Sequence, residues 1–167
     1  CLGGTGADEF FYGYNKIQKL LKIDFNLVKK IKNIDLIKKF SFSGWDNNKK
    51  LNSYVKTINK LINIYKKKKP DFRKNIFSIC DFIRFIDLNV FMSQISSPHS
   101  DSIAMMHSIE IRSPFLDNEI TKIALEKINH EFLLNENSIE NTKQFLKKAL
   151  ELRCNDLGLS SNELIEN

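Results

Sequence analysis

The sequence contains few of the residues that form loops and covalent cross-links. Its 167 residues include six Gly, three Pro and three Cys. So little Gly and Pro favours long regular elements over a loop-rich fold. The cysteines, Cys1, Cys80 and Cys154, contain no CxxC pair. We therefore predict neither a disulfide framework nor a zinc site.

Long apolar runs are also missing. No stretch reaches the length of a membrane span, and none has the features of a signal peptide. We expect a soluble, cytoplasmic chain without a membrane partner. The net charge is +6, carried mainly by Lys. The run of Lys66 to Lys69 precedes Pro70 and has no interleaved Arg or aromatic residue. A lysine-rich helix end explains it, and a nucleic-acid partner is not expected.

The residues that are present suit one helical domain. Hydrophobic residues make up 42% of the chain, enough for a core at this length. Apolar periodicity predicts helices over 10–21, from Asp24 as N-cap through Ile37, and over 48–67, 75–96, 97 or 100 to 109, 118–128 and 142–153. The 75–96 helix is apolar almost all round, so it should be central. We predict a loop over 129–141 and a mainly α chain with one strand end at its N-terminus.

The most distinctive stretch opens the chain, as Cys1-Leu2-Gly3-Gly4-Thr5-Gly6-Ala7-Asp8-Glu9. Three glycines in four positions let the backbone turn tightly and bring its N–H groups close to a ligand. A helix that starts there would favour an anion. Asp8 would repel a bare phosphate, but it could hold Mg²⁺ against one. The alternative is a capped turn, with Thr5 as N-cap and Asp8 at N3.

A second stretch, from Ser100 to Asp117, gathers acidic, basic and small residues. Its candidate functional side chains are Asp101, His107, Glu110, Arg112 and Asp117. If the preceding helix continues, His107 and Glu110 are neighbours on one face.

Each of these side chains also has a structural interpretation. Asp101 can be a first-turn acid, His107 a partly buried histidine and Asp117 an N-cap, while Arg112 can pair with Glu110. No nucleophile has a base and an orienting acid at an interpretable spacing, so a catalytic triad is not predicted.

Together the two stretches resemble the asparagine synthetase family. Residues 3–14 resemble the "SGxGADELFGGY" segment of its synthetase domain, and residues 101–117 resemble its "D…SMAHSLEVRVPFLD" segment. Asp87 falls where the family tends to carry an acid. The stretch from Lys143 to Ala149 is similar to the family's "K-x-L-L-R-x-A". The resemblance extends from residue 1 to about Arg153.

The resemblance implies a fold, a reaction and cofactors. The fold is the helical C-terminal part of an α/β domain of the ATP-pyrophosphatase type (adenine nucleotide α-hydrolase-like). In such glutamine-dependent amidotransferases, ammonia comes from glutamine hydrolysed in a separate glutaminase domain. ATP, with Mg²⁺, activates a carboxylate such as that of aspartate as an acyl-adenylate. Ammonia then attacks, and AMP and pyrophosphate leave.

The resemblance also implies roles for particular residues. Gly3, Gly4 and Gly6 would lie against ATP or its pyrophosphate, Asp8 would hold Mg²⁺, and Thr5 would influence formation of the acyl-adenylate. On the substrate side, or positioning groups there, would be Asp101, His107, Glu110, Arg112 and Asp117.

Several residues depart from the family pattern. Thr5 replaces a Glu, Gly3 replaces a Ser, Ser102 stands where many members have a basic residue, and Met106 replaces a small Ala. These changes resemble branches that amidate a sugar acid or a peptide carboxylate in surface-polysaccharide or modified-peptide pathways. That acceptor is the first alternative to aspartate. A non-catalytic helical interaction module, or remnant, is the second.

The chain begins inside a strand-to-turn junction without Met. We therefore expect residues 1–167 to be a C-terminal fragment of the synthetase domain, cut at both ends. The family's ATP-binding "SGGxDS" loop and the glutaminase domain would lie upstream, and its catalytic Lys would follow Asn167. The fragment alone should be inactive. Whether it pairs as a homodimer stays open.

Overall fold

The computed structural model describes residues 1–41, 48–128 and 143–160, with side chains described from residue 54 onward in the second range. Within these residues it is mainly helical, as predicted, and its only β pairing is one isolated bridge between Leu2 and Arg112. The helices in chain order are α1 (Ala7–Phe11), α2 (Asn15–Leu21), α3 (Phe25–Lys30), α4 (Asn33–Phe40), α5 (Asn48–Lys68), α6 (Ile76–Ile86), the π-helix η2 (Asp87–Ser96), α7 (Ser97–Met106), the 3-10 helix η3 (Pro114–Leu116), α8 (Asn118–Lys122), the π-helix η4 (Ile123–Lys127) and α10 (Gln144–Asp156).

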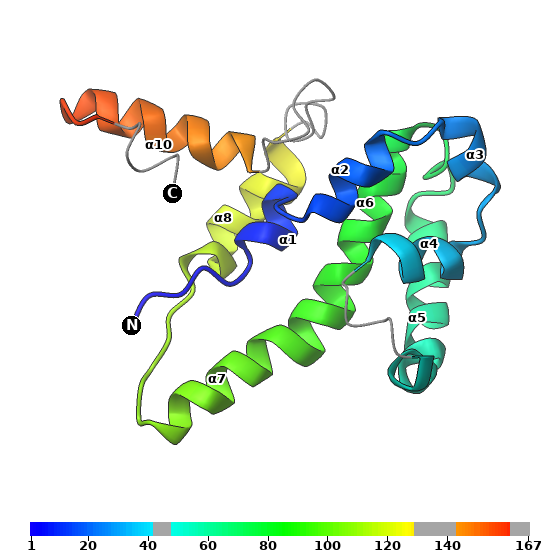
Figure 1. Cartoon of the computed structure of the whole chain (residues 1–167), viewed down its shortest axis with the longest axis horizontal. Helices are drawn as coiled ribbons and strands as arrows, with labels where there is room; N and C mark the ends of the chain where they lie inside the picture. The colour runs from blue at the N-terminus through cyan, green and yellow to red at the C-terminus, as the bar shows by residue number, and fades with distance from the viewer. Residues whose placement is uncertain (42–47, 129–142, 161–167) are drawn as a thin grey trace.

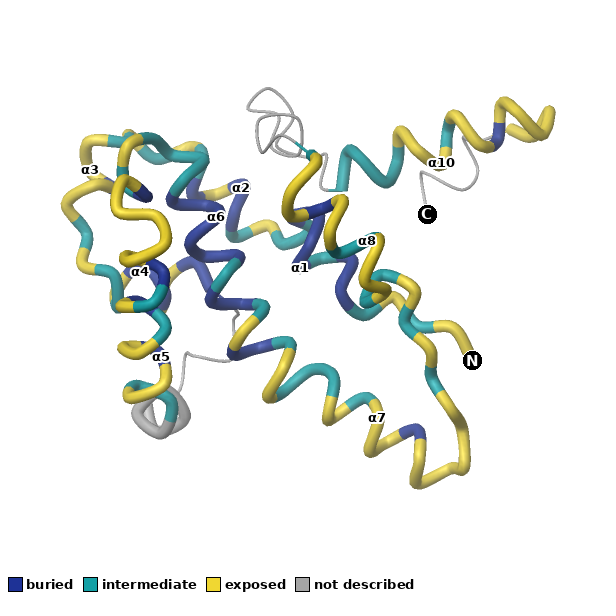
Figure 2. Tube along the Cα trace, turned by 180° about the vertical axis from the view of Figure 1, so that it is seen from behind, coloured by how far each residue is buried: buried dark blue, intermediate teal, exposed yellow. Residues whose placement is uncertain are grey.

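The long central element is α6, η2 and α7, which continue into one another without a break (Figure 1). Asn75 starts it, because its side-chain oxygen accepts a hydrogen bond from the Ser78 N–H at 2.8 Å. α6 is buried on nearly all sides, which confirms the first half of the core helix predicted over 75–96. The second half is η2, in which only Asp87, Val90 and Phe91 are buried. α7 extends away from this core and is mostly exposed (Figure 2).

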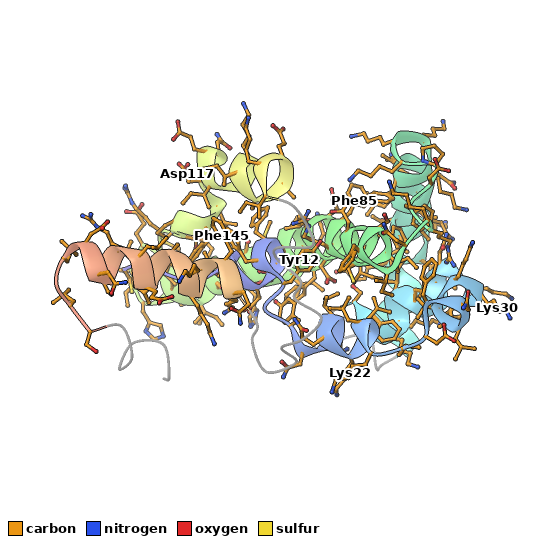
Figure 3. The ribbon with its side chains drawn as sticks, turned by 90° about the horizontal axis from the view of Figure 1, so that it is seen from above. Tyr12, Lys22, Lys30, Phe85, Asp117 and Phe145 are labelled. Carbon is orange, nitrogen blue, oxygen red and sulfur yellow. The ribbon has the colours of Figure 1, made fainter. Side chains whose placement is uncertain are left out.

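The helices around the central element form two groups. α2, α4 and α5 pack against α6 and enclose most of the apolar core. α1, η4 and the start of α10 form a second group, in which α1 packs against η2, η4 and α10 (Figure 1). The rings of Phe11 and Phe145 stack there at 5.7 Å between centroids, and Figure 3 labels Phe145 at the start of α10. This second group positions the opening turn. Within the described residues, no helix has the length and apolarity needed to cross a membrane.

The helix predicted over 10–21 is wrong as a single element. The chain breaks after α1 because Tyr12 has a left-handed backbone, with φ 55°. That conformation is unfavourable for a non-Gly residue. Burial compensates, since the Tyr12 side chain is only 2% exposed and its ring lies 4.8 Å from the Arg84 guanidinium carbon.

The helix predicted from Asp24 through Ile37 is also divided. Asp24 is the N-cap, as predicted, but α3 ends at Lys30 and the extended Ile31 leads to α4. The apolar periodicity of that single helix would place Leu27 on its inward face, but Leu27 is 58% exposed.

The predicted caps and ends farther along fare better. α5 ends two residues before Pro70. Asp117 caps α8 by accepting the N–H of Glu119 at 2.8 Å. α7 ends at Met106 rather than Ile109. The loop predicted over 129–141 lies outside the described residues.

Candidate functional site

The opening turn and the second stretch lie side by side. The N–H of Gly3 donates to the Arg112 carbonyl at 2.9 Å, and the Arg112 N–H donates to the Cys1 carbonyl at 2.9 Å. These two bonds form the parallel bridge between Leu2 and Arg112. The predicted strand end is therefore a single bridge, and it joins the two sequence motifs directly.

The glycines of the turn serve different purposes. A Cβ on Gly3 would lie 2.8 Å from the Ile111 Cγ2, so Gly3 permits the close approach of the two segments. Gly6 has φ +96°, and its Cβ would lie 2.7 Å from the Leu116 Cδ2. Gly4 has no such neighbour within 4 Å. Gly3 and Gly6 therefore have packing and conformational reasons to be Gly, and Gly4 alone faces open space.

Thr5 is not the N-cap of α1. The helix begins at Ala7, its N-cap is Gly6, and no side chain caps it. The chain turns through the left-handed Gly6, which places Thr5 one residue too early to cap the helix. This corrects the capped-turn alternative. Thr5 instead lines a cavity.

The cavity has a volume of about 540 Å³ and lies between the opening turn, α7 and the segment after it. It is lined by Thr5, Ser97, Pro98, Ser100, Asp101, Ile111, Ser113 and Leu116. Both sequence motifs therefore contribute side chains to one hollow. Convergent polar groups in a partly apolar concavity are typical of a small-molecule site.

Asp8 lies outside this lining and has partners of its own. Its Oδ1 is 2.9 Å from the Lys143 Nζ, and about a third of each side chain is exposed. A Cβ on Gly13 would lie 1.8 Å from the same Oδ1. Gly13 is therefore the residue that leaves room for the Asp8 carboxylate beside Lys143.

Glu9 points in a different direction and is buried. Its Oε1 accepts a hydrogen bond from the Tyr14 hydroxyl at 2.6 Å. Burial, and next this hydrogen bond, raise the pKa of Tyr14, so the phenol stays protonated. The second acid of the turn thus joins α1 to the start of α2.

The remaining predicted residues of the second stretch are dispersed. α7 ends before His107, and Ser108 has φ 55°, so His107 and Glu110 do not share a helical face. His107 is exposed rather than partly buried. Glu110 accepts from the Arg112 Nε at 3.0 Å, as expected, with both side chains largely exposed.

The two Asp residues of the second stretch lie in different places. Asp117 is the N-cap of α8 and is not among the cavity-lining residues. Asp101 lies in the second turn of α7, so it is not the first-turn acid of the structural interpretation. It lines the cavity instead.

In the part of the chain that the structure describes, no cluster of three or more His, Cys, Asp or Glu could hold a metal ion. Mg²⁺ needs no such cluster, since one or two carboxylates commonly hold it together with water and substrate phosphates. The single carboxylate of Asp8 fits that arrangement.

A buried ionic network was missed in the sequence. Arg84 on α6 donates to the Asp81 Oδ1 at 2.7 Å and to the carbonyls of Phe10 and Ala124 at 3.2 and 3.3 Å. It thereby holds α1 and η4 against α6. The available signal was two opposite charges three residues apart in an otherwise apolar helix.

Asp87, noted for its family position, is also buried and accepts a hydrogen bond from the Ser41 hydroxyl. It joins η2 to the end of α4. This contact belongs to the core and not to the cavity.

The structure brings the glycine-rich turn against the distant segment that contains Asp101 and Ser113, and both line one cavity. The family model described as asparagine synthase matches residues 1–156. The chain therefore belongs to the asparagine synthase family, a family of ligases and amidotransferases. No curated protein and no solved structure matched the chain.

Proposed function

We propose that the protein containing this chain uses ATP to activate a carboxylate as an acyl-adenylate and amidates it with ammonia derived from glutamine. AMP and pyrophosphate are the other products. The observation that carries the proposal is the cavity to which both family segments contribute, through Thr5 on one side and Asp101 and Ser113 on the other. Family membership supplies the reaction class.

The turn separates two sides of the proposed site. The acceptor lies in the cavity, next to Thr5. The phosphates lie on the side of Gly4, whose position is open, and of Asp8. Lys143 is the neighbouring cation and would balance the charge of Asp8 and of a phosphate together.

Enzymes of this family use ATP, and Asp8 is the residue proposed to hold Mg²⁺. When bound, the ion would neutralise the charge that develops on the departing pyrophosphate. Asp8 would hold it by one carboxylate, positioned by Gly13 and Lys143.

Two acceptors are considered. Aspartate is the acceptor that the family name suggests. A sugar acid is the alternative, and one observation favours it: four hydroxyl side chains line the cavity, from Thr5, Ser97, Ser100 and Ser113. Hydroxyls both donate and accept hydrogen bonds, as the hydroxyls of a sugar do.

The test is ATP–pyrophosphate exchange by the full-length protein, with aspartate and with uronic acids. Asp8→Asn should abolish exchange. It should cost at most about 1 kcal/mol of stability, because the ion pair that it removes is partly exposed. Asp35→Asn, at an exposed position on α4, is the matched control and should exchange normally.

Two results would contradict the proposal. Normal exchange by Asp8→Asn would make Asp8 only a first-turn acid of α1. No exchange with any carboxylate, in a protein whose upstream region lacks "SGGxDS", would favour the non-catalytic helical module.

A further inference from the structure

The polar side chains that line the cavity are not used by the fold. They are the hydroxyls of Thr5, Ser97, Ser100 and Ser113 and the carboxylate of Asp101. Among the described residues, none of these groups hydrogen-bonds another side chain or the backbone. Five residues whose polar side chains have no structural role line one hollow, and such a set is typical of a ligand site.

Two other serines of the same continuous helix do hydrogen-bond the backbone. Ser93 on η2 donates to the Asn89 carbonyl at 2.6 Å, and Ser102 on α7 donates to the Pro98 carbonyl at 2.7 Å. Bonds of this kind to the preceding turn are one arrangement that a helical serine can adopt. Ser97 and Ser100 do not make them and line the cavity instead.

The described lining of the cavity carries charge of one sign only. Asp101 is the single ionisable side chain among its described lining residues, with no Lys, Arg or His beside it. In a concave site, a lone carboxylate attracts a cationic group and disfavours a second anion. A ligand with two carboxylates and no amino group would place one carboxylate near Asp101 without a compensating cation.

We propose that Asp101 selects the acceptor by binding a positively charged amino group on it. The acceptor is then a hydroxylated carboxylate with a free amino group, such as an amino-uronic acid, rather than a carboxylate without an amino group. This assignment rests on the proposed function, because it takes the cavity as the acceptor side. The four hydroxyl side chains hydrogen-bond the sugar hydroxyls, and the Asp101 carboxylate accepts a charge-assisted hydrogen bond from the ammonium group.

The volume of the cavity agrees with this class. About 540 Å³ lies within the range of about 300–1,000 Å³ in which sites for small organic ligands generally fall. A sugar ring with its substituents uses such a space together with the apolar wall of Ile111 and Leu116.

The experiment uses the full-length protein and a matched pair of acceptors, 2-amino-2-deoxyglucuronate and glucuronate. In ATP–pyrophosphate exchange, kcat/KM should be about tenfold higher for the amino compound. Asp101→Asn should lower that value about tenfold, since one charge-assisted hydrogen bond is lost, so that the preference for the amino compound over glucuronate disappears. Asp101→Lys should shift preference toward dicarboxylates such as glucarate.

Asp24→Asn is the control, because it makes the same charge change at an N-cap, where Asn serves as well as Asp. Its acceptor preference should not change. Asp101 is exposed on α7, so its variants should melt as the wild type does. Equal use of the two acceptors by the wild type, or an unchanged preference in Asp101→Asn, would overturn the assignment while the proposed function stood.

Calorimetric binding of 2-amino-2-deoxyglucuronate separates the two proposals. If no acceptor supports exchange, the proposed function fails. Binding that is about tenfold weaker in Asp101→Asn would then still support the amino-binding role. No binding to the wild type, or equal binding to both proteins, would refute it.

Discussion

Replacing Arg84 by Met should strongly destabilise the protein, and the structure shows why. The Arg84 side chain is 2% exposed. It pairs with Asp81 at 2.7 Å and donates to the carbonyls of Phe10 and Ala124. Its guanidinium also lies over the ring of Tyr12. The substitution would leave a buried carboxylate and two carbonyls without this donor.

The magnitude follows from what stays behind. Removing one partner of a buried ion pair costs about 3–5 kcal/mol. Asp81 would keep the Tyr65 hydroxyl at 2.7 Å and the Lys69 ammonium at 2.6 Å. Because these two donors still compensate its charge, we expect Arg84→Met to lose about 3–4 kcal/mol of the free energy of unfolding.

Urea unfolding of the full-length protein, followed by circular dichroism, measures the loss. Arg112→Met is the matched control, because Arg112 pairs with Glu110 at 3.0 Å but their side chains are 76% and 71% exposed. Exposed pairs contribute little, so the control should lose less than about 1 kcal/mol. Equal losses in the two variants would refute the argument that burial makes the Arg84 pair important.

Two further substitutions test the opening turn. Gly6→Ala should lose about 1–3 kcal/mol of the free energy of unfolding, because Gly6 has φ +96° and its Cβ would overlap a side chain. Gly4→Ala, in open space, should lose less than about 0.5 kcal/mol in the same urea titration. A costly Gly4→Ala would show that the open side of the turn is occupied in the protein. Tyr14→Phe should lose about 1.5–3 kcal/mol, because it leaves the buried Glu9 carboxylate without its hydroxyl donor, and a loss below about 0.5 kcal/mol would mean that water replaces that donor.

The sequence was most informative where one local interaction decides the structure. Asp24 and Asp117 each cap a helix, as predicted, because in each case a short polar side chain precedes an apolar periodic run. The core helix after Asn75 was recognisable because it is apolar on every side. These features need no knowledge of distant contacts.

It was least informative where tertiary contacts override local preference. The break at Tyr12 depends on burial of its ring beside Arg84, and periodicity alone favoured one helix through this point. The exposed Leu27 and His107 show the same limit, because an apolar or amphipathic residue does not fix its own neighbours. Asp81 and Arg84 lie inside an apolar run, and its periodicity does not indicate that they form a buried ion pair.

The candidate site lies between these extremes. A glycine-rich turn by itself is compatible with a simple capped bend. The resemblance of two separate segments to one family is what predicts a binding site for ATP and its pyrophosphate at the turn. The structure adds a physical distinction within the turn. Gly3 and Gly6 are required by packing and φ, whereas Thr5 has no capping role and lines the cavity together with Asp101.

That distinction changes which residues an experiment should address. Substituting Gly3 or Gly6 would disturb the junction of the two segments, so lost activity there would not report on ligand binding. Thr5→Ala removes one hydroxyl from the cavity and no cap, so it should leave stability nearly unchanged. Any change in exchange kinetics would then come from the acceptor side of the turn. A loss of about 1 kcal/mol in stability would instead restore the capping role that the structure assigns to Gly6 alone.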